Sequence, residues 1–158
     1  MKKNSHRFMS LGIGSFLLTI FNFFQNIGVI YFFMLPIYFE AGIINDILDY
    51  KLFIKHKRYF WTHSPLSPLL IGLAIILGLF GIFINLPFSM FLTISMWFIF
   101  EIHILLDALN PTGIPLLFNN KKISNIPYDD FKWNAIFILI GIILTGMSLF
   151  NNLLIFYG

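Results

Sequence analysis

Long apolar stretches, separated by short polar segments, make up most of this chain. They run from Phe8 to Phe24, from about Ile27 to Ile44, from Leu66 to Ile84, from Phe88 to about Leu109 and from Trp133 to Phe150. A helix needs about 20 apolar residues to cross the hydrocarbon core of a bilayer. A membrane strand needs only ~9–11 residues and alternates in polarity, which these stretches do not. The pattern therefore predicts membrane-spanning helices.

Short polar turns join the first four stretches in pairs. The turns lie at 22–26 and at 85–87, and both are typical of tight helical hairpins. Pro36 is expected to kink the second helix, which membrane helices tolerate. We therefore expect a single all-α domain over residues 1–158, a polytopic membrane helical bundle with four core helices in two hairpins plus a C-terminal fifth helix. The polar segment 119–130 is expected to be a solvated connector.

Composition narrows the class of protein further. Hydrophobic residues make up 58% of the 158 residues and charged residues 11%, against roughly 25% charged in an ordinary soluble domain. A soluble core of this size cannot bury so much apolar surface, and disordered chains have low hydrophobicity. These values exclude a water-soluble single domain and a disordered chain. The absence of cysteine excludes disulfides and thiolate nucleophiles or ligands.

Every Lys and Arg falls on one side when the chain is threaded through a membrane along these helices. Positive charge favours the cytoplasmic side, so the N-terminus is expected there, with the C-terminus outside if the fifth helix crosses. The first stretch also resembles a signal peptide, but no A-x-A-like cleavage site follows it, so we expect a retained helix. The basic residues are Lys2, Lys3, Arg7, Lys51, Lys55, Lys57, Arg58, Lys121, Lys122 and Lys132.

The ionisable side chains gather on this same side, where neighbouring helix ends can bring them to one interfacial site. His103 and Asp107 are four residues apart and share a helix face. Imidazole and carboxylate both suit Zn²⁺ and related ions, although a simple His–Asp hydrogen bond is the alternative. Ionisable residues within membrane spans are usually functional. The histidines are His6, His56, His63 and His103, and the acids are Glu40, Asp46, Asp49, Glu101, Asp107, Asp129 and Asp130.

Two other groups carry weaker signals. In Thr62-His63-Ser64-Pro65, Ser64 is predicted to cap a helix that begins at Pro65. His63 would then lie at a helix N-terminus, which favours anions such as phosphate, or simply at an ordinary capped helix start.

Asp46 and Asp49 share a helix face, where they repel each other unless a cation lies between them or one is protonated. A solvated helix end is the alternative there.

These residues resemble the YdjM-like family of predicted membrane-bound metal-dependent hydrolases, over about residues 5–120. The family has a (Thr/Gly/Ser)-His pair before its first apolar segment, then Pro-Asp-x-Asp-His, Thr-His-Ser, and His-x-x-x-Asp followed by Thr-Pro-x-Gly and Pro-Leu-Leu. The last block is the most specific. The corresponding segments here are Ser5-His6, Asn45-Asp46-Ile47-Leu48-Asp49, Thr62-His63-Ser64, His103-Ile104-Leu105-Leu106-Asp107 and Pro111-Thr112-Gly113-Ile114-Pro115-Leu116-Leu117.

The chain also departs from the family pattern at two places. Asp49 stands where the family has His, so only Asp46 transfers cleanly from that motif. Arg58-Tyr59-Phe60 stands where the family has His-Arg-Gly, with His56 two residues out of register. These departures put one ligand in question and leave open whether full activity is retained.

The resemblance implies an integral hydrolase of a bacterial or archaeal inner membrane that binds a divalent metal, zinc by expectation. The family is also distantly similar to the helical zinc-dependent phospholipase C and nuclease enzymes, which implies a phosphoester or lipid headgroup as substrate. Asp49 and His56 are weaker candidates for ligation or catalysis. The implied metal ligands are His6, Asp46, His63, His103 and Asp107.

Two further hypotheses stay open beside the hydrolase. A metal or proton transporter would need polar residues through the full thickness of the membrane, whereas the outer halves of the spans are almost purely apolar, with exceptions such as Ser15, Thr19 and Thr93. A catalytically inactive membrane interaction protein is consistent with the altered motifs. Nothing in the sequence indicates a nucleic-acid partner, and it identifies no protein partner.

Overall fold

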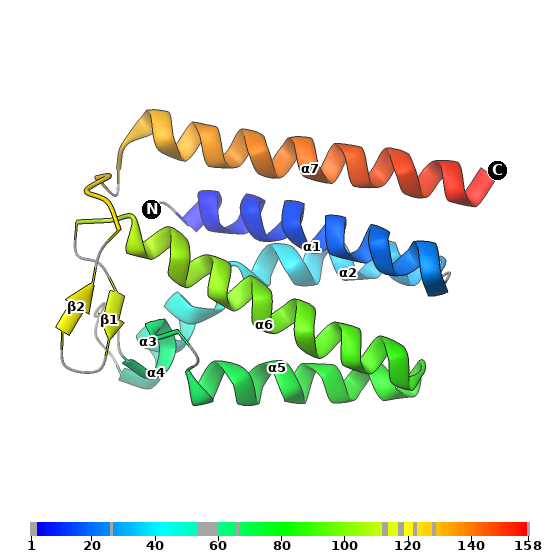
Figure 1. The fold of residues 1–158 in the computed structure, drawn as a ribbon, viewed down its shortest axis with the longest axis horizontal. Helices are drawn as coiled ribbons and strands as arrows, with labels where there is room; N and C mark the ends of the chain where they lie inside the picture. The colour runs from blue at the N-terminus through cyan, green and yellow to red at the C-terminus, as the bar shows by residue number, and fades with distance from the viewer. Residues whose placement is uncertain are drawn as a thin grey trace.

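The computed structural model describes residues 3–25, 27–53, 60–65, 67–111, 114–116, 119–121, 123–127 and 129–157. The chain is helical, as the apolar pattern predicts, and its long helices lie side by side along the long axis of the molecule (Figure 1). The candidate residue His56 lies outside the described residues. The helices are α1 (Lys3–Gln25), α2 (Ile30–Ala41), α3 (Ile44–Phe53), α4 (Phe60–His63), α5 (Pro68–Phe80), the short 3-10 helix η1 (Gly81–Phe83), α6 (Leu86–Ala108) and α7 (Phe131–Tyr157).

Three helices, α1, α6 and α7, are long and apolar enough to cross a membrane, which indicates a membrane protein. The pair α2 and α3 passes the same test as one span, with a bend of 47° at the break. α2 continues through Pro36, and this bend comes later, at Gly42 and Ile43. The segment Pro68–Phe83 is apolar but shorter. Five crossings therefore stay a prediction, while the helical fold with apolar helices of membrane-spanning length is confirmed.

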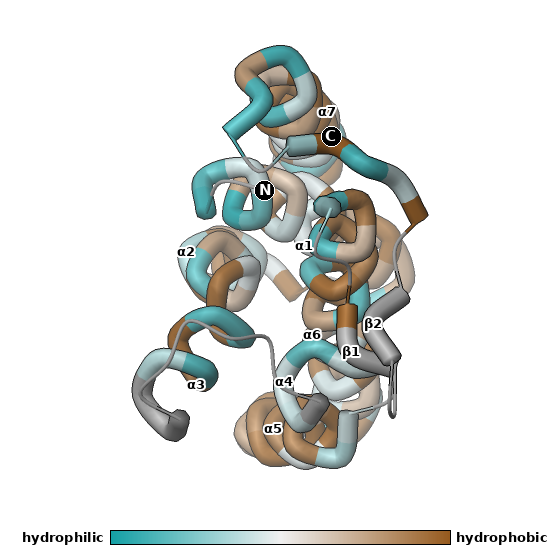
Figure 2. Tube along the Cα trace, turned by 90° about the vertical axis from the view of Figure 1, so that its left-hand side faces the viewer, coloured by the Kyte–Doolittle hydropathy of each residue, from teal (hydrophilic) through white to brown (hydrophobic). Residues whose placement is uncertain are grey.

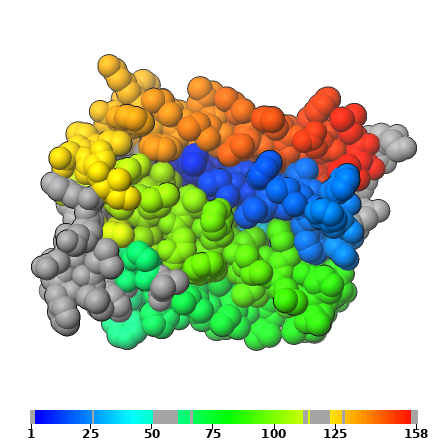
Figure 3. Space-filling view, in the orientation of Figure 1, coloured from blue at the N-terminus to red at the C-terminus, as the bar shows by residue number. Residues whose placement is uncertain are grey.

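α1 is the central helix of the bundle, packed against α2, α6 and α7. Figure 3 shows α7, α1, α6 and α5 side by side across one face. A Cβ atom placed on Gly12 would lie 2.7 Å from the backbone oxygen of Gly141 on α7, so these glycines permit close approach of two helix backbones. Polar pairs fix α7 near both ends: Ser5 Oγ donates to Asn134 Oδ1 (2.5 Å), and Asn22 Nδ2 donates to Asn152 Oδ1 (2.6 Å).

The predicted start of the third span is wrong by three residues. The sequence Ser64-Pro65-Leu66-Ser67-Pro68 contains the Ser-Pro signal twice, and the structure uses the second copy. Ser67 caps α5 by accepting a hydrogen bond from the Leu70 N–H, and Pro68 is the first helical residue. His63 instead ends the short helix α4. The predicted anion site at a helix start on Ser64 is therefore withdrawn.

A small antiparallel hairpin of β1 (Ile114–Leu116) and β2 (Asn119–Lys121) follows α6. The expected connector from residue 119 onward is therefore strand at its beginning. Strands of three residues are too short to show a period-two polarity pattern. The hairpin lies at the same end of the bundle as the N-terminus, α3 and α4 (Figure 1). Hydrophilic residues gather at this end, which faces the viewer in Figure 2.

Candidate metal centre

Four ionisable side chains from three helices converge at the polar end of the bundle. Asp46 comes from α3, His63 from the end of α4, and His103 and Asp107 from the last turns of α6. Each offers one ligand atom, and the four atoms all lie within 4.8 Å of one another. Residues that are widely separated in sequence are thus brought to one point, because α3 packs against both α4 and α6, and α4 also packs against β1, which follows α6. This group could hold a metal ion.

The distances between these atoms suit tetrahedral coordination. His63 Nε2 lies 3.7 Å from Asp46 Oδ1 and 3.4 Å from Asp107 Oδ2. His103 Nε2 lies 3.7 Å from Asp46 Oδ1 and 3.6 Å from Asp107 Oδ2. A tetrahedral ion with bonds of about 2.1 Å has ligand atoms about 3.4 Å apart. The four distances are therefore close to those around a bound ion.

A backbone carbonyl orients the His103 ring. His103 Nδ1 lies 2.7 Å from the carbonyl oxygen of Gly42, at the break between α2 and α3. A carbonyl can only accept a hydrogen bond, so Nδ1 carries the proton and Nε2 has a free lone pair. Metal-bound histidines commonly have their second nitrogen fixed in this way.

A carboxylate plays the same part for His63. His63 Nδ1 lies 3.0 Å from Asp49 Oδ2, and the Thr62 hydroxyl donates to Asp49 Oδ1. Asp49 therefore contacts the far side of the His63 ring, whereas Asp46 is close to Nε2. The i, i+3 spacing of the two aspartates on α3 places them on the two sides of one imidazole.

Asp107 is held by two polar side chains on its outer oxygen. His6 Nε2 from α1 lies 3.3 Å from Asp107 Oδ1, and Asn110 Nδ2 donates to the same oxygen at 3.2 Å. The His6 ring also stacks on the His103 ring, with centroids 4.2 Å apart. His6 is thus brought to the site, but beside Asp107 and outside the group of four converging atoms.

The four side chains have the features expected of a cation-binding site. The Nε2 atoms of His63 and His103 are buried and have no hydrogen-bond partner within the described part of the chain. Buried polar atoms without partners are rare and call for an explanation such as an ion. A cation at the common point would satisfy both nitrogens and separate the two facing carboxylates. The Asp46 side chain is 32% exposed, whereas the other three are at most 3% exposed, so the centre opens on the Asp46 side.

The electrostatics of His63 reflect its three acidic neighbours. Burial alone lowers the pKa of His63, but the nearby carboxylates of Asp107, Asp46 and Asp49 outweigh burial and raise the pKa to about 10. Without a metal ion, His63 is therefore protonated at neutral pH, and the proton occupies the place of the cation. Binding of a metal must displace this proton.

Comparisons with models of known protein families, with curated proteins and with solved structures found no match. The resemblance to the YdjM-like family therefore stays a prediction. The site is therefore assigned from its own geometry.

Three supporting groups went beyond what the sequence indicated. The Gly42 carbonyl could not be found from residue type, because any residue has one. Thr62 was noted only as part of a predicted helix start and of the Thr-His-Ser motif, and Asn110 was given no role. The position of Thr62 beside Asp49 follows from the packing of α3 and α4, whereas Asn110 lies three residues after Asp107 and its contact is local.

Proposed function

We propose that this protein is an integral membrane hydrolase that uses a divalent metal ion, zinc in the first instance, at the Asp46–His63–His103–Asp107 centre. The observation that carries the proposal is the convergence of two imidazole nitrogens without hydrogen-bond partners and two carboxylate oxygens at near-tetrahedral distances. Imidazole with carboxylate is a common donor set for zinc. A bound zinc ion would lower the pKa of a coordinated water toward about 7 and polarise a phosphoryl oxygen.

The proposed ligands fall into a buried, rigid set and one exposed residue. His63, His103 and Asp107 are buried and fixed by Asp49, the Gly42 carbonyl and His6, so they form the rigid part of the site. Asp46 stands at the exposed side. Catalytic zinc sites keep one position for water, and Asp46 is the group placed to share that position or to accept the proton of the water.

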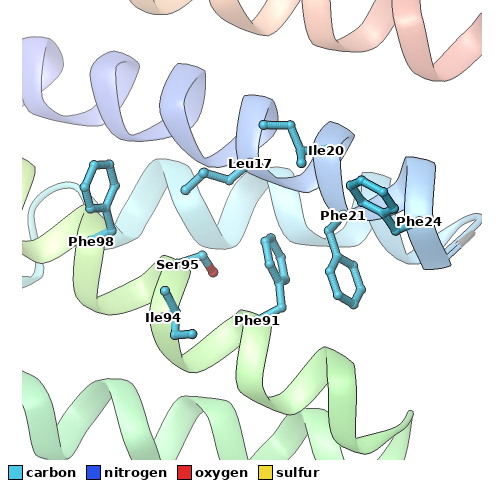
Figure 4. A pocket seen from close by; sticks show the side chains of 8 residues that line it. All are labelled: Leu17, Ile20, Phe21, Phe24, Phe91, Ile94, Ser95 and Phe98. Carbon is cyan, nitrogen blue, oxygen red and sulfur yellow. The ribbon is translucent and has the colours of Figure 1, made fainter.

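A lipid phosphoester is the substrate class that the surroundings favour. The centre lies at the polar end of apolar, membrane-length helices, at the depth where headgroups would meet it. Along the same helices α1 and α6, an apolar groove forms a cavity of about 350 Å³ (Figure 4). Ser95 is the polar member of its lining, and its hydroxyl is paired with the Tyr38 hydroxyl at 2.7 Å. Hydrocarbon therefore suits this groove.

The groove and the centre are close along α6. Phe98 lines the groove and His103 is five residues later, which is about 8 Å along a helix axis. An acyl chain in the groove would leave its headgroup within reach of the polar end of the bundle. We place that end in the cytoplasm, in an inner membrane, because the basic residues of the sequence fall on this side.

Metal analysis and hydrolysis of a soluble probe test the proposal together. Detergent-purified protein should contain about one zinc per chain, and zinc-loaded protein should hydrolyse bis(4-nitrophenyl) phosphate. The variant His103→Ala should lose both properties, whereas Asn151→Ala, on the exposed surface of α7, should lose neither. Purified wild type that takes up no divalent metal would contradict the proposal.

A structural metal centre in an interaction protein is the second candidate. The observation in its favour is that four protein atoms already suit a tetrahedron, and structural zinc sites are closed in this way. This candidate predicts metal binding and metal-dependent stability without hydrolysis. Zinc-loaded protein that is inactive on phosphomonoester, phosphodiester and lipid probes would favour it.

A further inference from the structure

Four further buried polar atoms, none of them on a proposed metal ligand, also lack hydrogen-bond partners among the described residues. They are His6 Nδ1 and Ser10 Oγ on α1, and both atoms of the Asn45 side-chain amide on α3. These residues are at most 1% exposed, and none of these atoms has a hydrogen-bond partner among the described residues. An amide buried with neither end paired is costly. The set therefore points to a ligand.

Packing at Gly42 brings the two helices of this set together. A Cβ atom on Gly42 would lie 2.6 Å from Ser10 Oγ and 2.6 Å from the His6 carbonyl oxygen. Gly42 thus sits directly against α1 between His6 and Ser10, which are themselves four residues apart on one helix face. No larger residue fits at this position without moving α1.

Asn45 faces the same interior. It is three residues after Gly42, whose carbonyl contacts His103, and four residues before Asp49, whose carboxylate contacts His63. Spacings of three and four place residues on one helix face. The Asn45 side chain, which is 0% exposed, therefore lies on the same face of α3 as Asp49.

The chemistry of the unpaired atoms selects the ligand. His6 Nε2 faces a carboxylate oxygen of Asp107, which accepts, so in the neutral ring Nδ1 is an acceptor. Asn45 Oδ1 is an acceptor, Asn45 Nδ2 is a donor, and the Ser10 hydroxyl can donate or accept. A phosphate oxyanion would leave the acceptors unpaired, and a metal cation would leave the amide donor unpaired. Water both donates and accepts.

We propose that Asn45, Ser10 and His6 bind ordered water between α1 and α3, on the protein side of the metal centre. The two ends of one amide face different directions, so more than one water molecule is bound. Buried waters typically make about three hydrogen bonds to otherwise unpaired groups. If the proposed hydrolase function holds, this water hydrates the centre from within a bundle whose surroundings are hydrocarbon.

A structure of the zinc-loaded protein without substrate, at a resolution that shows water elsewhere, tests the binding directly. We expect density within about 2.7–3.2 Å of the Asn45 amide and the Ser10 hydroxyl. The variant Asn45→Leu should lose this density and keep its zinc, whereas Asn45→Ser should keep both. Ser148→Ala is the matched control, because its hydroxyl is also buried but lies on α7.

Hydrolysis of bis(4-nitrophenyl) phosphate by the same proteins tests whether the bound water contributes to catalysis. Asn45→Leu should lower kcat about 10-fold to 100-fold, while Asn45→Ser and Ser148→Ala stay close to wild type. A wild-type map without density at Asn45 would overturn the inference even if the enzyme is active. Density at Asn45 in a wild type that hydrolyses nothing would confirm the water site and refute the proposed function. Density that appears only with added glycerol phosphate would also overturn the inference, because the ligand would then be a substrate hydroxyl.

Discussion

At the scale of single residues, the site depends on which nitrogen of each imidazole is free. The Gly42 carbonyl fixes Nδ1 of His103, and the Asp49 carboxylate fixes Nδ1 of His63. Both rings therefore present Nε2 to the same point, 3.4–3.7 Å from the carboxylate oxygens. Ligands and supporting residues should consequently respond differently to substitution.

Removal of a ligand should abolish metal binding, while removal of a supporting residue should only weaken it. We expect His63→Ala and His103→Ala to retain no zinc after dialysis. Asp49→Asn and His6→Ala should retain zinc with an affinity about 10-fold to 100-fold lower, because they orient a ligand without donating an atom to the ion. Competition with a coloured chelator measures these affinities. Equal losses in all four variants would show that His6 or Asp49 is itself a ligand.

Metal affinity should rise with pH. The pKa of His63 in the metal-free protein is raised to about 10, so one proton must leave for each ion bound at neutral pH. The zinc affinity should then increase about tenfold per pH unit between about pH 7 and 9.

The stability of the metal-free protein should change with pH in the opposite direction. Because the folded pKa is above the unfolded value of about 6.5, the stability that His63 contributes is complete below pH 6.5 and is lost as the pH rises through 10. Isothermal titration and thermal unfolding at several pH values measure both trends, and a pH-independent affinity would contradict the assignment.

At the scale of elements, the length of the apolar runs predicted the helices, but local signals misplaced their ends. The repeated Ser-Pro of residues 64–68 gave two equivalent starts for α5, and in the structure Ser67 caps the helix while its hydroxyl donates to the Trp61 carbonyl. The i, i+4 spacing of His103 and Asp107 needed no such choice, because both lie within one uninterrupted helix. Spacing rules were therefore reliable inside helices and ambiguous between them.

The groove between α1 and α6 gives a prediction at this scale. Ile94 lines the groove and is 60% exposed, so Ile94→Trp should fill the space without disturbing the core. Hydrolysis of a long-chain phospholipid in vesicles should fall about tenfold, while hydrolysis of bis(4-nitrophenyl) phosphate stays unchanged. Ile76→Trp, on the exposed surface of α5, is the control. Equal loss with both substrates would show that the groove does not hold a substrate chain.

At the scale of the whole molecule, the sequence could predict that the ionisable residues gather at one end of the bundle, but not which of them meet. His6, which was predicted as a ligand, contacts Asp107, and its ring stacks on His103 where α1 crosses α6. Asp49 contacts His63 Nδ1 on the side opposite Asp46 because α3 packs against α4. These outcomes depend on angles between helices, which no local pattern encodes.

The arrangement of the whole chain also predicts a topology that can be measured with little disturbance. The chain contains no cysteine, so single cysteines can be introduced one at a time at exposed polar positions. Asn4 lies at the polar end of the bundle with the metal centre, and Asn151 lies near the C-terminus at the other end. In cells, Asn151→Cys should react with a membrane-impermeant maleimide, whereas Asn4→Cys should react only after the membrane is opened if the proposed cytoplasmic orientation of the polar end holds. Labelling of Asn4→Cys in intact cells would place the metal centre on the outer side, and labelling of both sites in intact cells would contradict a fully crossing α7.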